Sequence, residues 1–366
     1  MTRFLIQYYS TTLASIASRI EQQSLPLQGW KLEFPSDNTT LILNDAIERL
    51  DDVNLHVGLN LILERYSHSR EDAEADTKAI AENILNLITY STLAFCGAAR
   101  LTSITEFQEH GNPLFSSYIY PFDENEKMGS IVPVAQQEFR EIFDAMGKTG
   151  GQERVARALS WLRKGINEEN IVDEFAAYWI GLEVLKSILR RMLKMKSKKP
   201  AEWDGVKNIY VNELHFSDFD KVEKARDKLF HGFESLTTAF IDEIKAHTEP
   251  TRKTLLASLA SVLGLPQPTR DSLQNKTVRR IRKKPWTVIW GEMENLPSAL
   301  DEIAGNFPRI SAQPKITYSL SPTGELEMKI EVAHQFHGPD GVSWHPTDSE
   351  QRADKDSGVR GIDVLS

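Results

Sequence analysis

The chain has 366 residues, 40% of them apolar and 26% charged, so it can bury a sizeable core and form two or three domains. Lys and Arg total 43 and Asp and Glu total 52, which gives a net charge of −9. This balance excludes a surface that coats nucleic acid nonspecifically through counterion release. Any contact with nucleic acid must therefore come from a local patch.

Cysteine usage and hydropathy suggest the compartment. Cys96 is the single cysteine, which excludes a disulfide framework and a thiolate zinc cluster and predicts a reducing cytoplasm. The longest uncharged run, residues 83–99, is too short and too polar for a membrane span, which needs roughly 20 apolar residues. Polar residues interrupt any signal-peptide core in residues 1–18, so this stretch is predicted to begin a folded helix.

Residues 1–130 combine two hydrophobic periods, that of a β-strand and that of an α-helix. Residues 55–63 place Leu or Val at every second position, which predicts a strand, and similar short runs occur at 30–34 and 116–122. Residues 71–95 begin with acids that suit a helix N-terminus and continue as a helical stripe. We predict an α+β domain over residues 1–130, which carries no catalytic signature.

From residue 131 to residue 265 the hydrophobic period is helical almost throughout. Polar turn residues at 122–130 mark the start of this second domain. Short connections between long helical segments are typical of a helical bundle. The predicted helical segments are residues 136–147, 154–166, 168–193, 223–236 and 251–265.

The hydrophobic pattern changes again after residue 265. Residues 286–293 and 315–332 alternate as strands do, with a turn at 322–324, so residues 266–337 are predicted to form a small β-containing region. Residues 338–366 are polar and are predicted to be a disordered tail. The predicted fold class is therefore multidomain and mostly α, with an α+β N-terminal domain, a central helical bundle and this β-containing region.

The segment Glu223 to Leu236 places charged residues beside an apolar stripe. Arg226 falls at the edge of the stripe, and His231, five residues on, points roughly 140° away on a straight helix. Asp227 lies one turn before His231, so it is predicted to orient the imidazole. At about 100° per residue, the stripe contains Val222, Ala225, Leu229, Phe233, Leu236, Phe240 and Ile244.

Glu183 is the one ionisable carboxylate in residues 175–185, which are apolar nearly all the way round. A helix of this kind is central in its bundle, and a carboxylate within it needs a cationic partner. We predict that Arg226 is this partner. The alternatives are that Glu183 belongs to a plain buried ion pair, or that Arg226 extends to solvent and His231 is a solvated surface residue.

Residues 226–232, "RDKLFHG", resemble the signature of the HEPN superfamily, in which an Arg and a following polar residue precede a His by four to six intervening positions. Residues 177–185, "AYWIGLEVL", are similar to the aromatic-then-"LE" helix of the Apea-like branch. Residues 157–166 resemble the helix before it. The resemblance covers residues 135–265.

The resemblance implies a helical domain that dimerises, with two Arg-to-His motifs lining a cleft. Active members are metal-independent endoribonucleases without a cofactor, which commonly serve in phage defence or as toxins. RNA is then the substrate, and an antitoxin or trigger protein is a further partner. His231 suits the acid or base role and Arg226 the binding of the scissile phosphate, while Glu183 fixes the guanidinium and Asp227 orients the imidazole.

The alternative is a noncatalytic HEPN-like module for interaction or nucleotide binding. Family members often have Asn where this chain has Asp227. An Asp here disfavours a nearby phosphate by like-charge repulsion, or else supports His231 as an acid. The sequence leaves both possibilities open.

Two runs of basic residues are candidates for RNA contact, although the chain as a whole is acidic. Basic charge beside aromatic residues can follow a nucleic-acid backbone and stack bases, although such runs also occur as solvated helix ends. The predicted RNA-binding residues are Lys194, Lys196, Lys198, Lys199, Arg280 and Arg282. No metal is predicted, because the spacing of His334, His337, Asp340 and His345 matches no standard zinc site.

Overall fold

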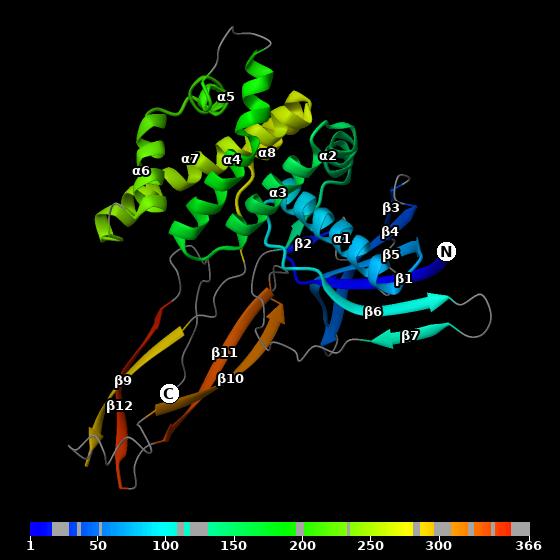
Figure 1. Ribbon diagram of the computed structural model, residues 1–366. Helices are drawn as coiled ribbons and strands as arrows, with labels where there is room; N and C mark the ends of the chain where they lie inside the picture. The colour runs from blue at the N-terminus through cyan, green and yellow to red at the C-terminus, as the bar shows by residue number, and fades with distance from the viewer. Residues whose placement is uncertain are drawn as a thin grey trace. The chain divides into compact units, whose positions relative to one another are not determined.

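The chain divides into two compact units, Met1–Ile281 (unit 1) and Arg282–Ser366 (unit 2). The prediction of a mostly α protein is wrong, because unit 1 combines its helices with a six-stranded antiparallel sheet and is mixed α/β (Figure 1). The computed structural model describes residues 1–16, 29–34, 38–50, 53–107, 113–117, 131–194, 201–232, 235–280, 286–295, 309–320, 326–337 and 341–352.

The sheet of unit 1 has the strand order β3-β4-β5-β1-β6-β7, and each neighbouring pair is antiparallel. The strands predicted at residues 30–34 and 55–63 are confirmed. The strands are β1 (Thr2–Ser10), β3 (Trp30–Phe34), β4 (Thr39–Leu50), β5 (Val53–Ser67), β6 (Arg100–Phe107) and β7 (Leu114–Ser117).

The helix predicted at the N-terminus is wrong, since residues 2–10 form β1 near the middle of the sheet. Phe4, Ile6, Tyr8 and Ser10 are buried at every second position, which is the period of a strand. The Tyr8 hydroxyl donates to the backbone oxygen of Glu74, 3.0 Å away on the first helix. The buried face of β1 therefore packs beneath that helix.

Helix α1 (Arg70–Thr92) lies across one face of the sheet, as Figure 1 shows, and confirms the helix predicted there. Ser69 caps its N-terminus by accepting a hydrogen bond from the Asp72 backbone N–H at 3.1 Å. The second half of α1 is buried almost all round, because it also packs against the helices that follow in the chain. This burial joins the sheet to the helical part of unit 1.

Helix α4 is central in the helical part, packed between α3 and α7. A Cβ on Gly165 would lie 2.3 Å from the Tyr178 ring, and a Cβ on Gly181 would lie 2.7 Å from Leu255, so glycine permits both close approaches. The helices are α2 (Gln136–Lys148), α3 (Gln152–Asn167), α4 (Ile171–Lys194), α5 (Asp204–Asn208), the π-helix η2 (Ile209–Glu213), α6 (Phe219–His231), α7 (Thr238–Leu263) and α8 (Gln267–Asn275).

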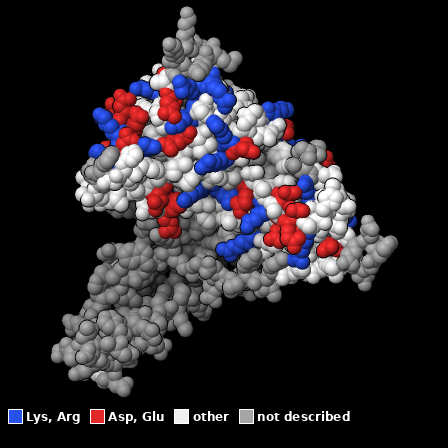
Figure 2. Space-filling view, viewed as in Figure 1, with Lys and Arg blue, Asp and Glu red and all other residues white. Residues whose placement is uncertain are grey.

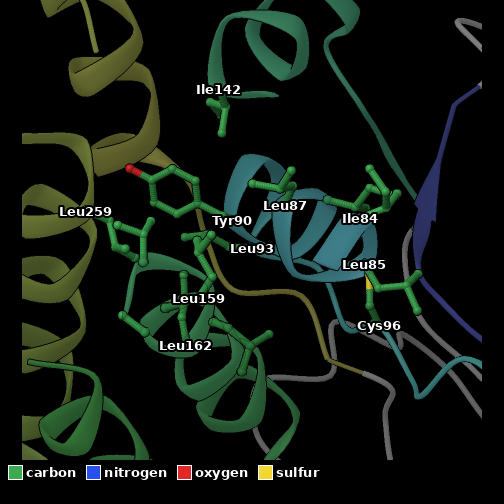
Figure 3. Close-up of a cluster of buried hydrophobic side chains, with 14 of the residues drawn as sticks. Ile84, Leu85, Leu87, Tyr90, Leu93, Cys96, Ile142, Leu159, Leu162 and Leu259 are labelled. Atoms are coloured by element: carbon green, nitrogen blue, oxygen red, sulfur yellow. The ribbon is translucent and has the colours of Figure 1, made fainter. Parts of the chain in front are cut away.

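The predicted domains 1–130 and 131–265 share one core. Strand β2 (Ala14–Ser15) pairs in parallel with β8 (Val132–Pro133), and the Tyr90 hydroxyl of α1 donates to the Leu256 backbone oxygen of α7 at 3.2 Å. Figure 3 shows α1 side chains meeting those of α2, α3 and α7. The chain therefore divides into compact units at Ile281 rather than at residue 130.

The segment that carries the candidate motif forms two helices, so the predicted apolar stripe does not run along one continuous helix. Helix α6 ends at His231, where Gly232 adopts a left-handed conformation (φ 64°) and its N–H bonds to the Lys228 oxygen. Helix α7 begins at Thr238, and Leu236 between the two helices is 58% exposed. The predicted stripe therefore breaks after α6, although its members on both helices include buried residues.

Unit 2 contains two antiparallel strand pairs within its described residues. Strand β9 (Trp286–Glu294) pairs with β12 (Ser343–Arg352), and β10 (Arg309–Leu320) pairs with β11 (Leu326–His337). The strands predicted in the β-containing region are present, but residues 343–352, predicted as part of the disordered tail, instead form β12. Across the described residues of both units, none of the helices has the length and apolarity to cross a membrane.

Candidate active site on helices α4 and α6

The structure brings Arg226 and Glu183 together, as the sequence predicts. Helix α4 supplies Glu183 and helix α6 supplies Arg226, whose Nη2 donates to Glu183 Oε1. The side chains are 24% and 27% exposed, so the pair is partly buried and still open to solvent. Part of the Arg226 side chain is therefore accessible to solvent.

Aromatic side chains fix this pair. Trp179 lies one turn before Glu183 on α4, and its Nε1 donates to Glu183 Oε1 at 3.1 Å. Arg226 Cζ lies 5.3 Å from the centre of the Phe230 ring and 6.0 Å from that of Trp179. Neither aromatic was predicted as part of the site, although the four-residue spacing of Trp179 and Glu183 is the signal that indicates their contact.

Asp227 is the second carboxylate on Arg226. Arg226 Nη1 donates to Asp227 Oδ1 at 2.7 Å, so the carboxylate that was predicted to orient His231 instead binds the neighbouring Arg226. Burial opposes the charge of the guanidinium, but the hydrogen bonds and negative charges of Asp227 and Glu183 raise the pKa of Arg226 above its ordinary value. One fixed cation and two carboxylates leave this cluster with a net negative charge.

His231 is the last residue of α6, and it is exposed. Five residues separate it from Arg226, which corresponds to about 7.5 Å along the helix axis and about 140° around it. The two predicted catalytic residues therefore lie on different faces of α6. A single site that uses both needs a second element, such as the same helix of another copy.

Arg280, one of the predicted RNA-binding residues, is used inside unit 1. Its Nε donates to the Ile166 backbone oxygen at 2.9 Å, at the C-terminal end of α3, and its Nη2 lies 2.5 Å from Glu174 Oε1. Buried Glu174 also accepts from the Tyr178 hydroxyl at 2.9 Å. Arg280 thus ties the end of α3 to α4, and this argues against its predicted role in RNA binding.

Replacing Arg280 by alanine is expected to destabilise unit 1 by about 2 kcal/mol, because Glu174 then stays buried without its cation. The estimate lies below the roughly 3–5 kcal/mol of a fully buried pair, since the Arg280 side chain is 32% exposed. Urea unfolding measures the loss. Arg279→Ala is the matched control, because the side chain of Arg279 is exposed and its backbone makes the contacts with Leu93 and Phe95.

The structure does not define a binding site around the other predicted RNA-binding residues. Lys194 is the last residue of α4. Lys196, Lys198, Lys199 and Arg282 lie outside the described residues. Figure 2 shows Lys and Arg interspersed with Asp and Glu over the described face of unit 1, so that face carries mixed charge.

Two further sets of titratable side chains are Cys96 and the cluster of His334, His337, Asp340 and His345. Cys96 is fully buried, and burial raises the pKa of its thiol, as befits the core residue that the sequence predicts. Within the residues that the structure describes, no three His, Cys, Asp or Glu side chains are grouped so that they could hold a metal ion. Asp340 of the histidine cluster lies outside those residues.

Comparisons of the chain with protein-family models, with curated proteins and with solved structures found no match.

Proposed function

We propose that this protein is a metal-independent endoribonuclease of HEPN type, with Arg226 and His231 as its catalytic residues. The observation that carries the proposal is the partly exposed Arg226, held on α6 by Glu183 of the preceding long helix. This arrangement suits a guanidinium that binds a phosphate from solvent. His231 follows at the exposed end of the same helix.

The chemistry needs few protein groups, because RNA carries its own nucleophile in the 2′-hydroxyl. The protein must position that hydroxyl in line with the scissile phosphate, move protons and stabilise the charge at phosphorus. Arg226 holds the phosphate, and Glu183 and Trp179 fix the guanidinium beneath it. His231 transfers a proton. The products are a 2′,3′-cyclic phosphate and a 5′-hydroxyl.

The geometry of α6 supports a homodimer as part of this proposal. Arg226 and His231 lie on different faces of the helix, so we infer that His231 of one copy works with Arg226 of another. RNA is the substrate, and an antitoxin or trigger protein controls the activity in the cytoplasm. Regulated RNA cleavage in phage defence or as a toxin is the biological role that this proposal includes.

A noncatalytic HEPN-like interaction or nucleotide-binding module is the second candidate. The observation that favours it is the pairing of Arg226 with two carboxylates, Glu183 and Asp227. A guanidinium engaged in this way has a structural role already, and the net negative charge around it weakens the attraction for phosphate.

The test is incubation of the purified full-length protein with a mixed pool of labelled RNAs in EDTA, followed by mapping of the product ends. We expect 2′,3′-cyclic phosphate ends, because cleavage uses the 2′-hydroxyl and no metal. Sedimentation in the same buffer gives the oligomeric state of the sample. A dimeric sample that cuts no RNA would favour the noncatalytic module.

A further inference from the structure

We propose that Asp227 occupies the place of the substrate phosphate on Arg226 in the free protein and moves to His231 when RNA binds. The inference rests on the proposed ribonuclease function and assigns Asp227 two successive positions. Its starting point is the observed hydrogen bond of 2.7 Å between Arg226 Nη1 and Asp227 Oδ1.

The two carboxylates on Arg226 are held differently. Glu183 Oε1 accepts both from Arg226 and from Trp179 Nε1, and its side chain is 27% exposed. Asp227 accepts from Arg226 and is 47% exposed. Asp227 is therefore the outer carboxylate, and a ligand approaching from solvent meets it before Glu183.

Carboxylate and phosphate oxygens bind a guanidinium in the same way, through charge-assisted hydrogen bonds. A phosphate can therefore replace Asp227 on Nη1 while Glu183 keeps its bond to Nη2. While Asp227 remains, its negative charge repels the incoming phosphate. The exchange makes and breaks hydrogen bonds only.

Asp227 has a destination when it leaves Arg226. His231 lies four residues further along α6, and side chains at this spacing are neighbours on a helix surface. There the carboxylate can accept a hydrogen bond from the imidazole and fix its orientation. The movement would free the phosphate site on this copy and orient the acid–base group that this copy contributes to the Arg226 of the other copy.

Asp227→Asn tests this exchange, and Asp220→Asn is the matched control. Asp220 lies on the same helix, pairs with Lys207 at 2.8 Å, and loses the same charge on substitution. The probe is a 2′-O-methyl RNA oligonucleotide, which lacks the nucleophile and so binds without being cut. Affinity is measured by fluorescence anisotropy, and cleavage of the matching unmodified RNA is measured alongside.

We expect D227N to bind the probe about fivefold more tightly than wild type, with D220N unchanged, because a single exposed ion pair competes at Arg226. We also expect D227N to cut bound RNA more slowly, because His231 loses its orienting carboxylate. Melting temperatures verify folding, and Asp227→Ser repeats the comparison with a smaller side chain.

Comparing Asp227→Asn, Asp220→Asn and Arg226→Ala distinguishes failure of this inference from failure of the proposed function. If D227N binds and cuts as wild type does, while Arg226→Ala weakens binding, the exchange is overturned and the ribonuclease assignment stands. Equal tightening in D227N and D220N would also overturn it, since that is a general charge effect. If Arg226→Ala binds as wild type does, or nothing binds, both proposals fail.

Discussion

Replacing His231 by alanine is expected to lower the rate of RNA cleavage by about 10²–10⁴-fold, the usual contribution of a positioned acid or base. The fold should not change, because His231 is exposed at the end of α6. Single-turnover cleavage in EDTA measures the loss, and melting temperatures verify that the variant is folded. His68→Ala, which removes another exposed histidine of unit 1, is the control and should cut RNA as wild type does.

The partner copy can be tested with the same variants. Arg226→Ala and His231→Ala should each be inactive, but an equal mixture should regain about one quarter of the activity, since half of the dimers are mixed and hold one complete site. If the mixture stays inactive although the copies exchange, the two residues do not work across a dimer. If His231→Ala alone cuts as fast as wild type, the noncatalytic module becomes the better account.

The Arg226–Glu183 pair was predictable because its cause is local. A single carboxylate in a helix that is otherwise apolar demands a cation, and Arg226 is a cation at the edge of an apolar stripe. The strand at residues 55–63 was predictable for a similar reason, since its alternation is visible within one short window. Patterns of this kind require no knowledge of which distant segments meet.

Other features depend on contacts that no local pattern reveals. In residues 2–10 the alternation of Phe4, Ile6 and Tyr8 is a partial local signal that Leu5 and Tyr9 obscure. The pairing of β1 with β5 and β6, which makes this segment a strand, is with distant segments. The shared core of residues 1–130 and 131–265 arises in the same way, since α1 is buried by helices far along the chain. Tertiary contacts decided these cases.

Within the site, the position of Asp227 could not be derived from spacing. Spacing favours a pair between Asp227 and His231, one turn later, because adjacent residues do not face each other on a helix. In the structure, the Asp227 carboxylate nevertheless binds Arg226, because the long side chain of Arg226 reaches the neighbouring carboxylate. Arg280 is a similar case, because a basic run looks solvent-facing until its buried partner Glu174 is known.

Trp179 links the core of unit 1 to the candidate site, so two substitutions at this position should have separable effects. Trp179 is 1% exposed, and the centre of its ring lies 4.8 Å from that of Trp203 and 6.1 Å from that of Phe219. Trp179→Ala removes this packing and should destabilise the protein by about 3–5 kcal/mol in urea unfolding. Trp179→Phe keeps an aromatic ring and should cost about 1 kcal/mol.

Of the two substitutions, Trp179→Phe is the more informative about function. Trp179→Phe removes the Nε1 donor from Glu183 Oε1, so the carboxylate that fixes Arg226 loses one of its two donors. If positioning of Arg226 matters for cleavage, Trp179→Phe should slow the reaction at a temperature where it is fully folded. Trp161→Phe on α3 is the matched control, because Trp161 is half-buried and contacts Lys164 rather than the site. Equal cleavage by both variants would mean that Glu183 holds the guanidinium without help from Trp179.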